Sequence, residues 1–182
     1  MQNEILLSIK KELENLNISL TEDDVFNFLK NEKRWPLRYT FGQPSLEIID
    51  NFGDNQSFFF KKNGYLNFEE WKKIYDLGFT TIISNVLDLN KDLRYIDNLL
   101  KIKLGKEING NFYFSIPGQL PSFFMHSHEY DVFVKQIYGE SDWIIGSKKF
   151  TLKPQQTTFI PKGENHQVIS KSNKKLSLTL NL

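Results

Sequence analysis

The feature that most constrains the fold is a series of short β-rich runs that begins near Asn109 and continues to the C-terminus. Each run is rich in β-branched, aromatic or leucine residues, and Gly, Pro, Asn or Ser separates it from the next, a pattern typical of strands joined by turns. The runs cover residues 112–115, 132–137, 143–145, 150–152, 157–160, 167–169 and 176–180. We therefore expect a mostly β fold with a closed barrel core over residues 106–182.

The N-terminal part has helical periodicity instead. Apolar residues recur at helical spacing in the opening segment, namely at Ile5, Ile9, Leu13 and Leu16. Thr21 and Asp24 fit a capping box that opens a second helix. We expect residues 1–105 to form a helix-rich part that flanks the barrel within one domain of 182 residues.

Further elements are expected between residue 36 and the barrel. Residues 36–42 and 46–49 favour short strands, and Asn67 and Asn90 are suited to cap two further helices. The aromatic run at 58–60 favours a buried strand, with a flap that grips the substrate as the alternative.

Charge and cysteine content restrict the partners. With Lys+Arg 23 against Asp+Glu 22, nothing indicates a nucleic-acid or membrane partner. The chain has no cysteine and no apparent signal peptide or membrane-spanning run, which agrees with a cytoplasmic location. We expect the Lys171–Lys175 cluster to be a solvated turn. The sequence leaves the oligomeric state open.

All three histidines of the chain fall in two short segments, His126-Ser-His128 and His166. Residues two apart on a strand point to the same face, so His126 and His128 can share a cavity that His166 enters from a later strand. Imidazole suits Fe, Cu, Ni and Zn. The alternative is two surface histidines on a loop and one hydrogen-bonded core histidine.

Several motifs in order resemble the JmjC-type cupins, and in particular the cupin-4 branch that contains ribosomal-protein histidine and arginine hydroxylases. The motifs are Gly78-Phe-Thr80, Asn111-Phe-Tyr-Phe-Ser-Ile-Pro-Gly118, His126-Ser-His-Glu-Tyr-Asp-Val-Phe133, Phe159-Ile-Pro161 and His166-Gln-Val168. The resemblance implies a double-stranded β-helix (cupin or jelly-roll) barrel. It also implies use of Fe(II), 2-oxoglutarate and O2 to hydroxylate a protein side chain.

Two positions depart from that family. His128 stands where the family usually has a carboxylate ligand, and Ser141 stands where it commonly has an Arg or Lys for the distal carboxylate of 2-oxoglutarate. A dicarboxylate needs a cationic partner, so we expect that 2-oxoglutarate is not bound in the family's usual way. Substitute cations would be Lys135, Lys148 or Lys153. A bulge could instead bring Glu129 or Asp131 to the metal.

The expected function is that of a metal-dependent oxygenase that oxidises a side chain of a peptide or protein, with O2 as co-substrate. His126, His128 and His166 would hold the metal ion. We expect Fe(II) first, copper second, and zinc or nickel after these two. No other catalytic side chain is assigned. The alternatives are a three-histidine dioxygenase acting on a small molecule and a non-catalytic metal-binding cupin. Candidate cofactor- or substrate-binding residues are Asn111, Tyr113, Ser115, Phe124, Gln136 and Ser141.

Overall fold

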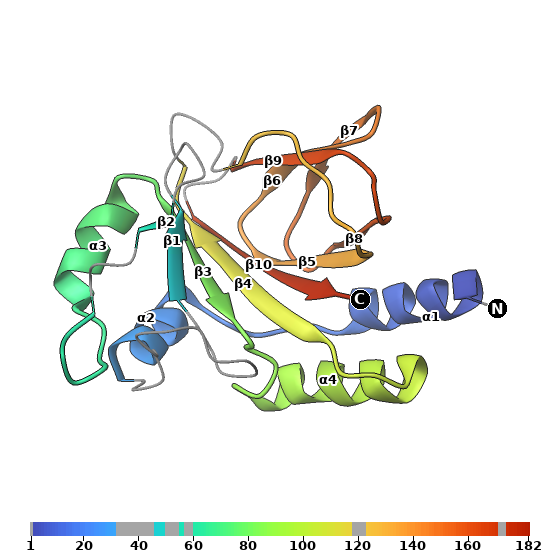
Figure 1. Ribbon diagram of the computed structural model, residues 1–182. Helices are drawn as coiled ribbons and strands as arrows, with labels where there is room; N and C mark the ends of the chain where they lie inside the picture. Colours follow the sequence, from blue (N-terminus) through green and yellow to red (C-terminus); the bar gives the residue numbers. More distant parts are fainter. Residues whose placement is uncertain (1, 32–45, 50–54, 57–59, 118–122, 171–173) are drawn as a thin grey trace.

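The computed structural model describes residues 2–31, 46–49, 55–56, 60–117, 123–170 and 174–182 (Figure 1). The helices are α1 (Gln2–Asn15), α2 (Glu22–Asn31), α3 (Phe68–Asp76) and α4 (Lys91–Leu104). The strands are β1 (Leu46–Ile49), β2 (Asn55–Gln56), β3 (Thr80–Ser84), β4 (Asn109–Ser115), β5 (Val132–Tyr138), β6 (Ser141–Ile145), β7 (Lys148–Leu152), β8 (Thr157–Ile160), β9 (His166–Ser170) and β10 (Lys175–Asn181). Among the described helices, none has the length and apolar character needed to cross a membrane.

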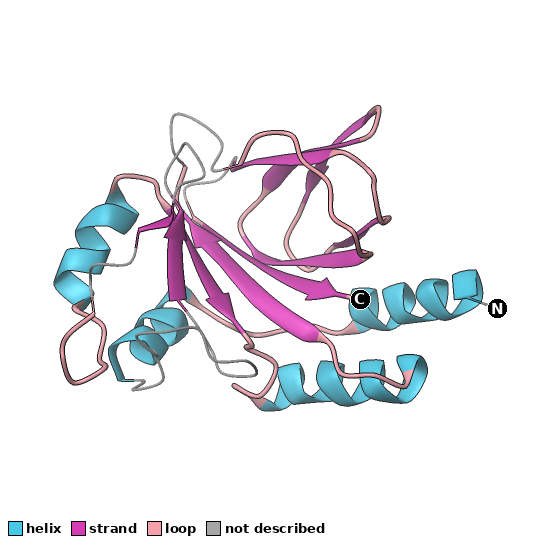
Figure 2. Cartoon of the chain, viewed as in Figure 1, coloured by secondary structure: helices cyan, strands magenta, loops and turns pink. Residues whose placement is uncertain are grey.

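The strands form two antiparallel sheets. The larger has the order β2-β1-β3-β4-β10-β5-β8, and the smaller has the order β7-β6-β9. The small sheet faces one end of the large sheet, and the helices lie on the other side of the large sheet (Figures 1 and 2). Consecutive strands β5 and β6 belong to different sheets, and Gly139 between them has a φ of 72°. Glycine adopts this left-handed conformation without strain.

The large sheet separates two apolar clusters because strand residues alternate between its faces. On β10, the three leucines pack into the core shared with the helices, namely Leu176, Leu178 and Leu180. The intervening residues of β10 face the space between the sheets. That interior has a smaller apolar cluster formed by Val132, Val134, Trp143, Leu152 and Ile160. One face of the large sheet therefore lines the interior between the two sheets, and its opposite face packs against the helices.

Most of the N-terminal expectations agree with the structure. The backbone N–H of Thr21 donates to the Asp24 carboxylate (2.8 Å), and the Asp24 N–H donates to the Thr21 hydroxyl (3.2 Å), which confirms the capping box. The Asn90 side chain accepts from the N–H of Leu93, whereas Asn67 precedes α3 without a side-chain cap. The strand expected at 46–49 is β1. Residues 36–42 and 58–59 lie outside the described residues.

Lys135 is fully buried on the helix-facing side of β5. Its ammonium donates to the carbonyls of Leu13 (2.7 Å) and Gln155 (2.9 Å). The Leu13 carbonyl lies in the last turn of α1, where carbonyls have no partner within the helix. Burial lowers the Lys135 pKa to about 8. This lysine thus attaches α1 to the sheet and does not face the barrel interior.

Replacing Lys135 with methionine is expected to lower the free energy of unfolding by about 1–3 kcal/mol, because two buried carbonyls lose their donor. Chemical denaturation would measure the change. Lys153→Met, at an exposed position outside the strands, is the matched control and should be nearly neutral. Equal stability of the two variants would contradict the anchoring role.

Candidate metal centre

Backbone hydrogen bonds bring the three histidines together. His126 lies in the loop before β5 and forms an isolated antiparallel bridge with His166. The His126 N–H donates to the His166 carbonyl (3.1 Å), and the His166 N–H donates to the His126 carbonyl (2.8 Å). The His128 carbonyl accepts from the N–H of Gly163 (2.8 Å). His128 therefore lies outside a regular strand, and the expected strand alternation of His126 and His128 is wrong although both reach one site.

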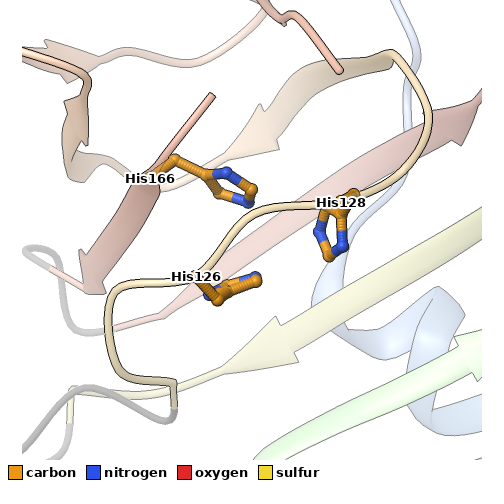
Figure 3. Close-up of side chains that lie close together, drawn as sticks. All are labelled: His126, His128 and His166. Carbon is orange, nitrogen blue, oxygen red and sulfur yellow. The ribbon is translucent and has the colours of Figure 1, made fainter. Parts of the chain in front are cut away.

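The three rings surround a common point (Figure 3). The ring centroids of His126 and His166 are 4.4 Å apart, and that of His128 is 4.9 Å from each. One nitrogen from each ring lies within 4.8 Å of the others. Because a metal–imidazole bond measures about 2.0–2.1 Å, the rings would have to move closer together to place all three nitrogens on one ion.

Two of the rings have a fixed tautomer. Nδ1 of His126 lies 2.8 Å from the Phe124 carbonyl oxygen, and Nδ1 of His166 lies 3.0 Å from the Glu164 carbonyl oxygen. A carbonyl only accepts, so each Nδ1 carries the hydrogen and leaves the Nε2 lone pair for a metal. Carbonyl contacts of this kind orient metal-binding histidines in proteins.

The electrostatic environment favours the neutral forms of His128 and His166. Burial, followed by the neighbouring His166 and His126, lowers the pKa of His128 to about 4. Burial also lowers the pKa of His166, against a raising effect of its bond to the Glu164 carbonyl. Neutral imidazole is the form that binds metal, so His128 and His166 are ready to bind at neutral pH.

The metal-free protein is expected to lose thermal stability as the pH falls from 6.5 towards 4. In this window the unfolded chain protonates His128 while the folded chain does not, so protons favour unfolding. Melting temperatures in the presence of a chelator would measure the loss, expected to be a few degrees. His128→Asn should have a shallower dependence on pH. Identical slopes for the two proteins would contradict the pKa shift.

The two carboxylates nearest in sequence are directed elsewhere. The Glu129 side chain is 92% exposed and pairs with Lys162 (3.4 Å). The Asp131 carboxylate accepts from the backbone N–H of Lys162 (2.7 Å). Among the described residues, neither belongs to the histidine cluster, so the expected alternative in which one of them binds the metal is not found. The candidate ligand set is therefore limited to His126, His128 and His166.

The histidines line a cavity of about 190 Å³ between the two sheets. Its other lining residues are Tyr113, Phe123, Tyr130, Val132, Val134, Trp143, Ile160, Val168, Lys175, Ser177, Thr179 and Asn181. The walls are largely apolar, with a polar stripe from β10. Among these lining residues there is no Asp or Glu.

The six candidate binding residues are placed differently. Tyr113 lines the cavity, whereas the lining does not include Asn111, Ser115, Phe124, Gln136 or Ser141. Phe124 is 65% exposed, and the other four are buried. Ser141 and Ser177 both donate to the Gln136 side-chain oxygen (2.9 Å each), and Trp143 Nε1 donates to Ser141 (3.0 Å). The Ser141 hydroxyl is thus engaged within the barrel wall.

Lys175 corrects one sequence expectation. The sequence predicts a solvated turn for the cluster that contains it, but Lys175 begins β10, is only 5% exposed and lines the cavity. Of the substitute cations expected from the sequence, Lys135 faces the helices, and Lys148 and Lys153 are exposed. Extending the alternation of β10 back by one residue places Lys175 on the same face as Ser177, and this signal could have identified it.

Comparisons with known proteins support the fold. No protein-family model and no curated protein matches the chain. Among solved structures, the ribosomal oxygenase YcfD from Escherichia coli, in complex with cobalt and succinic acid, has a TM-score of 0.64 at 16% identity. That match covers 92% of this chain but 45% of YcfD, so the chain spans less than half of its length. A second match is a cupin superfamily protein from Desulfitobacterium hafniense, with 16% identity and a TM-score of 0.37. That match covers 41% of this chain and 66% of the Desulfitobacterium protein.

The fold is therefore cupin-like, with two sheets, a mostly β core and N-terminal helices, as expected from the sequence. Identity at this level establishes the fold alone. The activity has to be inferred from the site.

Proposed function

We propose that the protein is a metal-dependent oxygenase that hydroxylates a side chain of a peptide or protein at a three-histidine centre. The observation that carries this proposal is that three imidazoles converge on one cavity. In two of them Nδ1 donates to a backbone carbonyl, which leaves Nε2 available to bind a metal. Iron(II) is the ion we favour, with copper next, since both suit imidazole and react with O2. The fold shared with YcfD, which is described as a ribosomal oxygenase, is consistent with this class.

The donor set fits such an ion, with His126, His128 and His166 as its protein ligands. When bound, the metal would supply the activation of O2. One oxygen atom would enter the substrate, and a two-electron donor, either a co-substrate such as a 2-oxo acid or an added reductant, would reduce the other. Three protein ligands leave other coordination positions for O2 and substrate. The apolar walls, including Val132, Val134 and Trp143, limit water near the reacting groups. The carbonyls of Phe124 and Glu164 hold two of the imidazoles in their binding orientation.

A peptide or protein substrate is favoured by the surface next to the histidines. Phe124 is 65% exposed, Met125 is 45% exposed and Tyr130 is 38% exposed, all within the loop that carries His126 and His128. Grouped exposed apolar side chains are typical of interaction surfaces. A side chain of a docked peptide could then enter the cavity while the peptide backbone remains outside.

A second candidate is a three-histidine dioxygenase that acts on a small molecule. The observation that favours it is the cavity volume of about 190 Å³, which is below the roughly 300–1,000 Å³ of common ligand pockets. This volume would hold a compact organic substrate entirely.

Labelled oxygen separates the two candidates. Iron(II)-loaded protein would receive ¹⁸O2 with a pool of synthetic peptides, with and without 2-oxoglutarate, and mass spectrometry would follow one-oxygen mass gains. We expect labelled peptide with the wild-type protein and none with His166→Ala. Labelled small-molecule product from a metabolite pool, with unmodified peptides, would favour the second candidate. If no condition consumed O2, the oxygenase proposal would fail and a non-catalytic metal-binding role would replace it.

A further inference from the structure

Among the residues that line the cavity, one carries a primary amine that the proposed oxygenase chemistry does not use. Lys175 is the first residue of β10, the strand between β4 and β5 in the large sheet (Figure 1). This lysine is 5% exposed, and its side chain lines the cavity. Lysine is almost never this buried without a partner, because removing an ammonium from water is costly. Its position therefore needs an explanation that packing alone does not provide.

The surroundings of Lys175 favour the neutral amine over the ammonium. Burial lowers its pKa to about 8, with no opposing contribution from a carboxylate. No Asp or Glu is found among the lining residues of the cavity. At pH 7 about one such amine in ten is neutral, against fewer than about one in a thousand for a lysine in water. Neutral amine is the form that attacks electrophiles, and desolvation in an apolar pocket is one way in which proteins activate a lysine.

Lys135 shows why the cavity matters as much as the burial. Burial lowers the pKa of Lys135 to about 8 as well. Its side chain, however, lies on the helix-facing side of β5 and donates to the carbonyls of Leu13 and Gln155. Lys135 is not among the residues that line the cavity, so a small molecule has no space beside its amine. Lys175 differs because a cavity of about 190 Å³ lies next to its side chain.

Two hydroxyl groups lie close to this amine. Ser115 is directly across from Lys175 in the β4–β10 register, so both side chains lie on one face of the sheet. The Ser115 hydroxyl is buried and has no hydrogen-bond partner among the described residues. Tyr113 is the diagonal neighbour of Lys175 and also lines the cavity, a separation that long side chains can span. Burial raises the Tyr113 pKa to about 12, so its phenol stays protonated and can donate.

We propose that Lys175 is a nucleophile that captures a small uncharged aldehyde as an imine in this cavity. The nitrogen lone pair forms a bond to the carbonyl carbon, and the Tyr113 phenol protonates the carbonyl oxygen and regains a proton from the nitrogen. The Ser115 hydroxyl accepts a hydrogen bond from the amine and orients it. The oxygen then leaves as water with the second proton of the nitrogen, and a C=N bond remains. No electrons are gained or lost, so no oxidant or reductant is needed.

The cavity determines the class of carbonyl compound. Its volume of about 190 Å³ limits the ligand to a small molecule. Its apolar walls, which include Val134 and Trp143, favour an uncharged ligand over a charged one. An aldehyde has one substituent on its carbonyl carbon where a ketone has two, so it fits this space more easily. Imine formation requires neither a metal nor O2, and the inference therefore goes beyond the proposed oxygenase.

The test is reductive trapping of propanal on the 182-residue chain at pH 7, with a chelator present and O2 absent. Cyanoborohydride reduces an imine to a stable secondary amine, and peptide mapping by mass spectrometry would locate the propyl group on each lysine. We expect Lys175 to be labelled at least about 10-fold faster than Lys174, because more of its amine is neutral. Lys174 is an exposed internal control whose pKa is raised by its pairing with Glu22. Lys135 should stay unlabelled while the protein is folded.

Tyr113→Phe keeps the aromatic ring and removes the proton donor. It should slow the labelling of Lys175 by about 10-fold or more, with the rate at Lys174 unchanged. An unchanged rate at Lys175 in this variant would overturn the phenol as the proton donor. The comparison among lysines of the wild-type protein needs no variant. Labelling of Lys175 no faster than that of Lys174, or equal labelling of Lys135 and Lys175, would overturn the nucleophile.

The assay also separates this inference from the proposed metal centre. The chelator removes any metal, so trapping at Lys175 would be unchanged if His126, His128 and His166 bound no ion. Conversely, a protein that bound metal and consumed O2 but trapped no propanal at Lys175 would keep the proposed function and reject the imine.

Discussion

Replacing His166 with alanine is expected to lower transition-metal affinity by about 100-fold or more, since even partners that only orient a ligand are worth 10–100-fold. The variant removes one of three donor nitrogens, and the two that remain cannot surround the ion. His126→Ala and His128→Ala should have similar effects. Elemental analysis after purification, followed by metal titration, would measure stoichiometry and affinity. The wild type should bind one ion per chain.

Alanine preserves the backbone, which makes these variants clean tests. The bridge between residues 126 and 166 uses only main-chain N–H and carbonyl groups, so His166→Ala should keep the loop in place. Gln167→Ala is a suitable neighbour control because its side chain bonds to the Phe123 carbonyl and takes no part in the cluster. Retention of one full equivalent of metal by His128→Ala would remove His128 from the ligand set.

Replacing His128 with aspartate is expected to change which metal is preferred. Carboxylate is a harder ligand than imidazole, so the ratio of iron to copper bound in competition should rise by about 10-fold or more. The substitution also lowers the charge of the loaded site by one. Competitive loading with both ions, analysed by elemental composition, would measure the ratio.

The matched control for this substitution is His128→Asn, which has nearly the same shape as aspartate without its charge. We expect the asparagine variant to lose affinity for both ions without the gain in iron preference. If both variants had the metal preference of the wild type, His128 would lie outside the coordination sphere. Tyr130, whose ring is parallel to that of His128 at 5.0 Å, would then be the main partner of this imidazole.

Local sequence patterns predicted the strands well. Alternation of side chains along residues 112–115 and 176–180 corresponds to β4 and β10, whose two faces have different partners. The capping box at Thr21 and Asp24 was also predictable, because it depends on residues only three positions apart. Strand alternation and the capping box each depend on residues within one short segment, so the sequence alone can reveal them.

Long-range placement was less accessible. The approach of His126 to His166 depends on a bridge across forty positions of sequence, and no local pattern specifies it. The buried position of Lys175 was missed because a run of lysines usually indicates a solvated turn, and the start of a strand is hard to locate to one residue. The role of Ser141 likewise depends on long-range contacts, because its hydroxyl and that of Ser177 both donate to the side-chain oxygen of Gln136.

The two faces of strand β10 have different partners, so substitutions on one face can be separated from those on the other. Its leucines carry the attachment of the helices, while Thr179 and Asn181 face the cavity. Substitutions at these two positions would alter the shape and polarity of the binding space and leave the helix-facing leucines untouched. Ser177 is more constrained, because its hydroxyl donates to Gln136. One side of this strand therefore supports the helical layer and the other lines the candidate cavity, so substitutions in the lining are expected to leave folding largely intact.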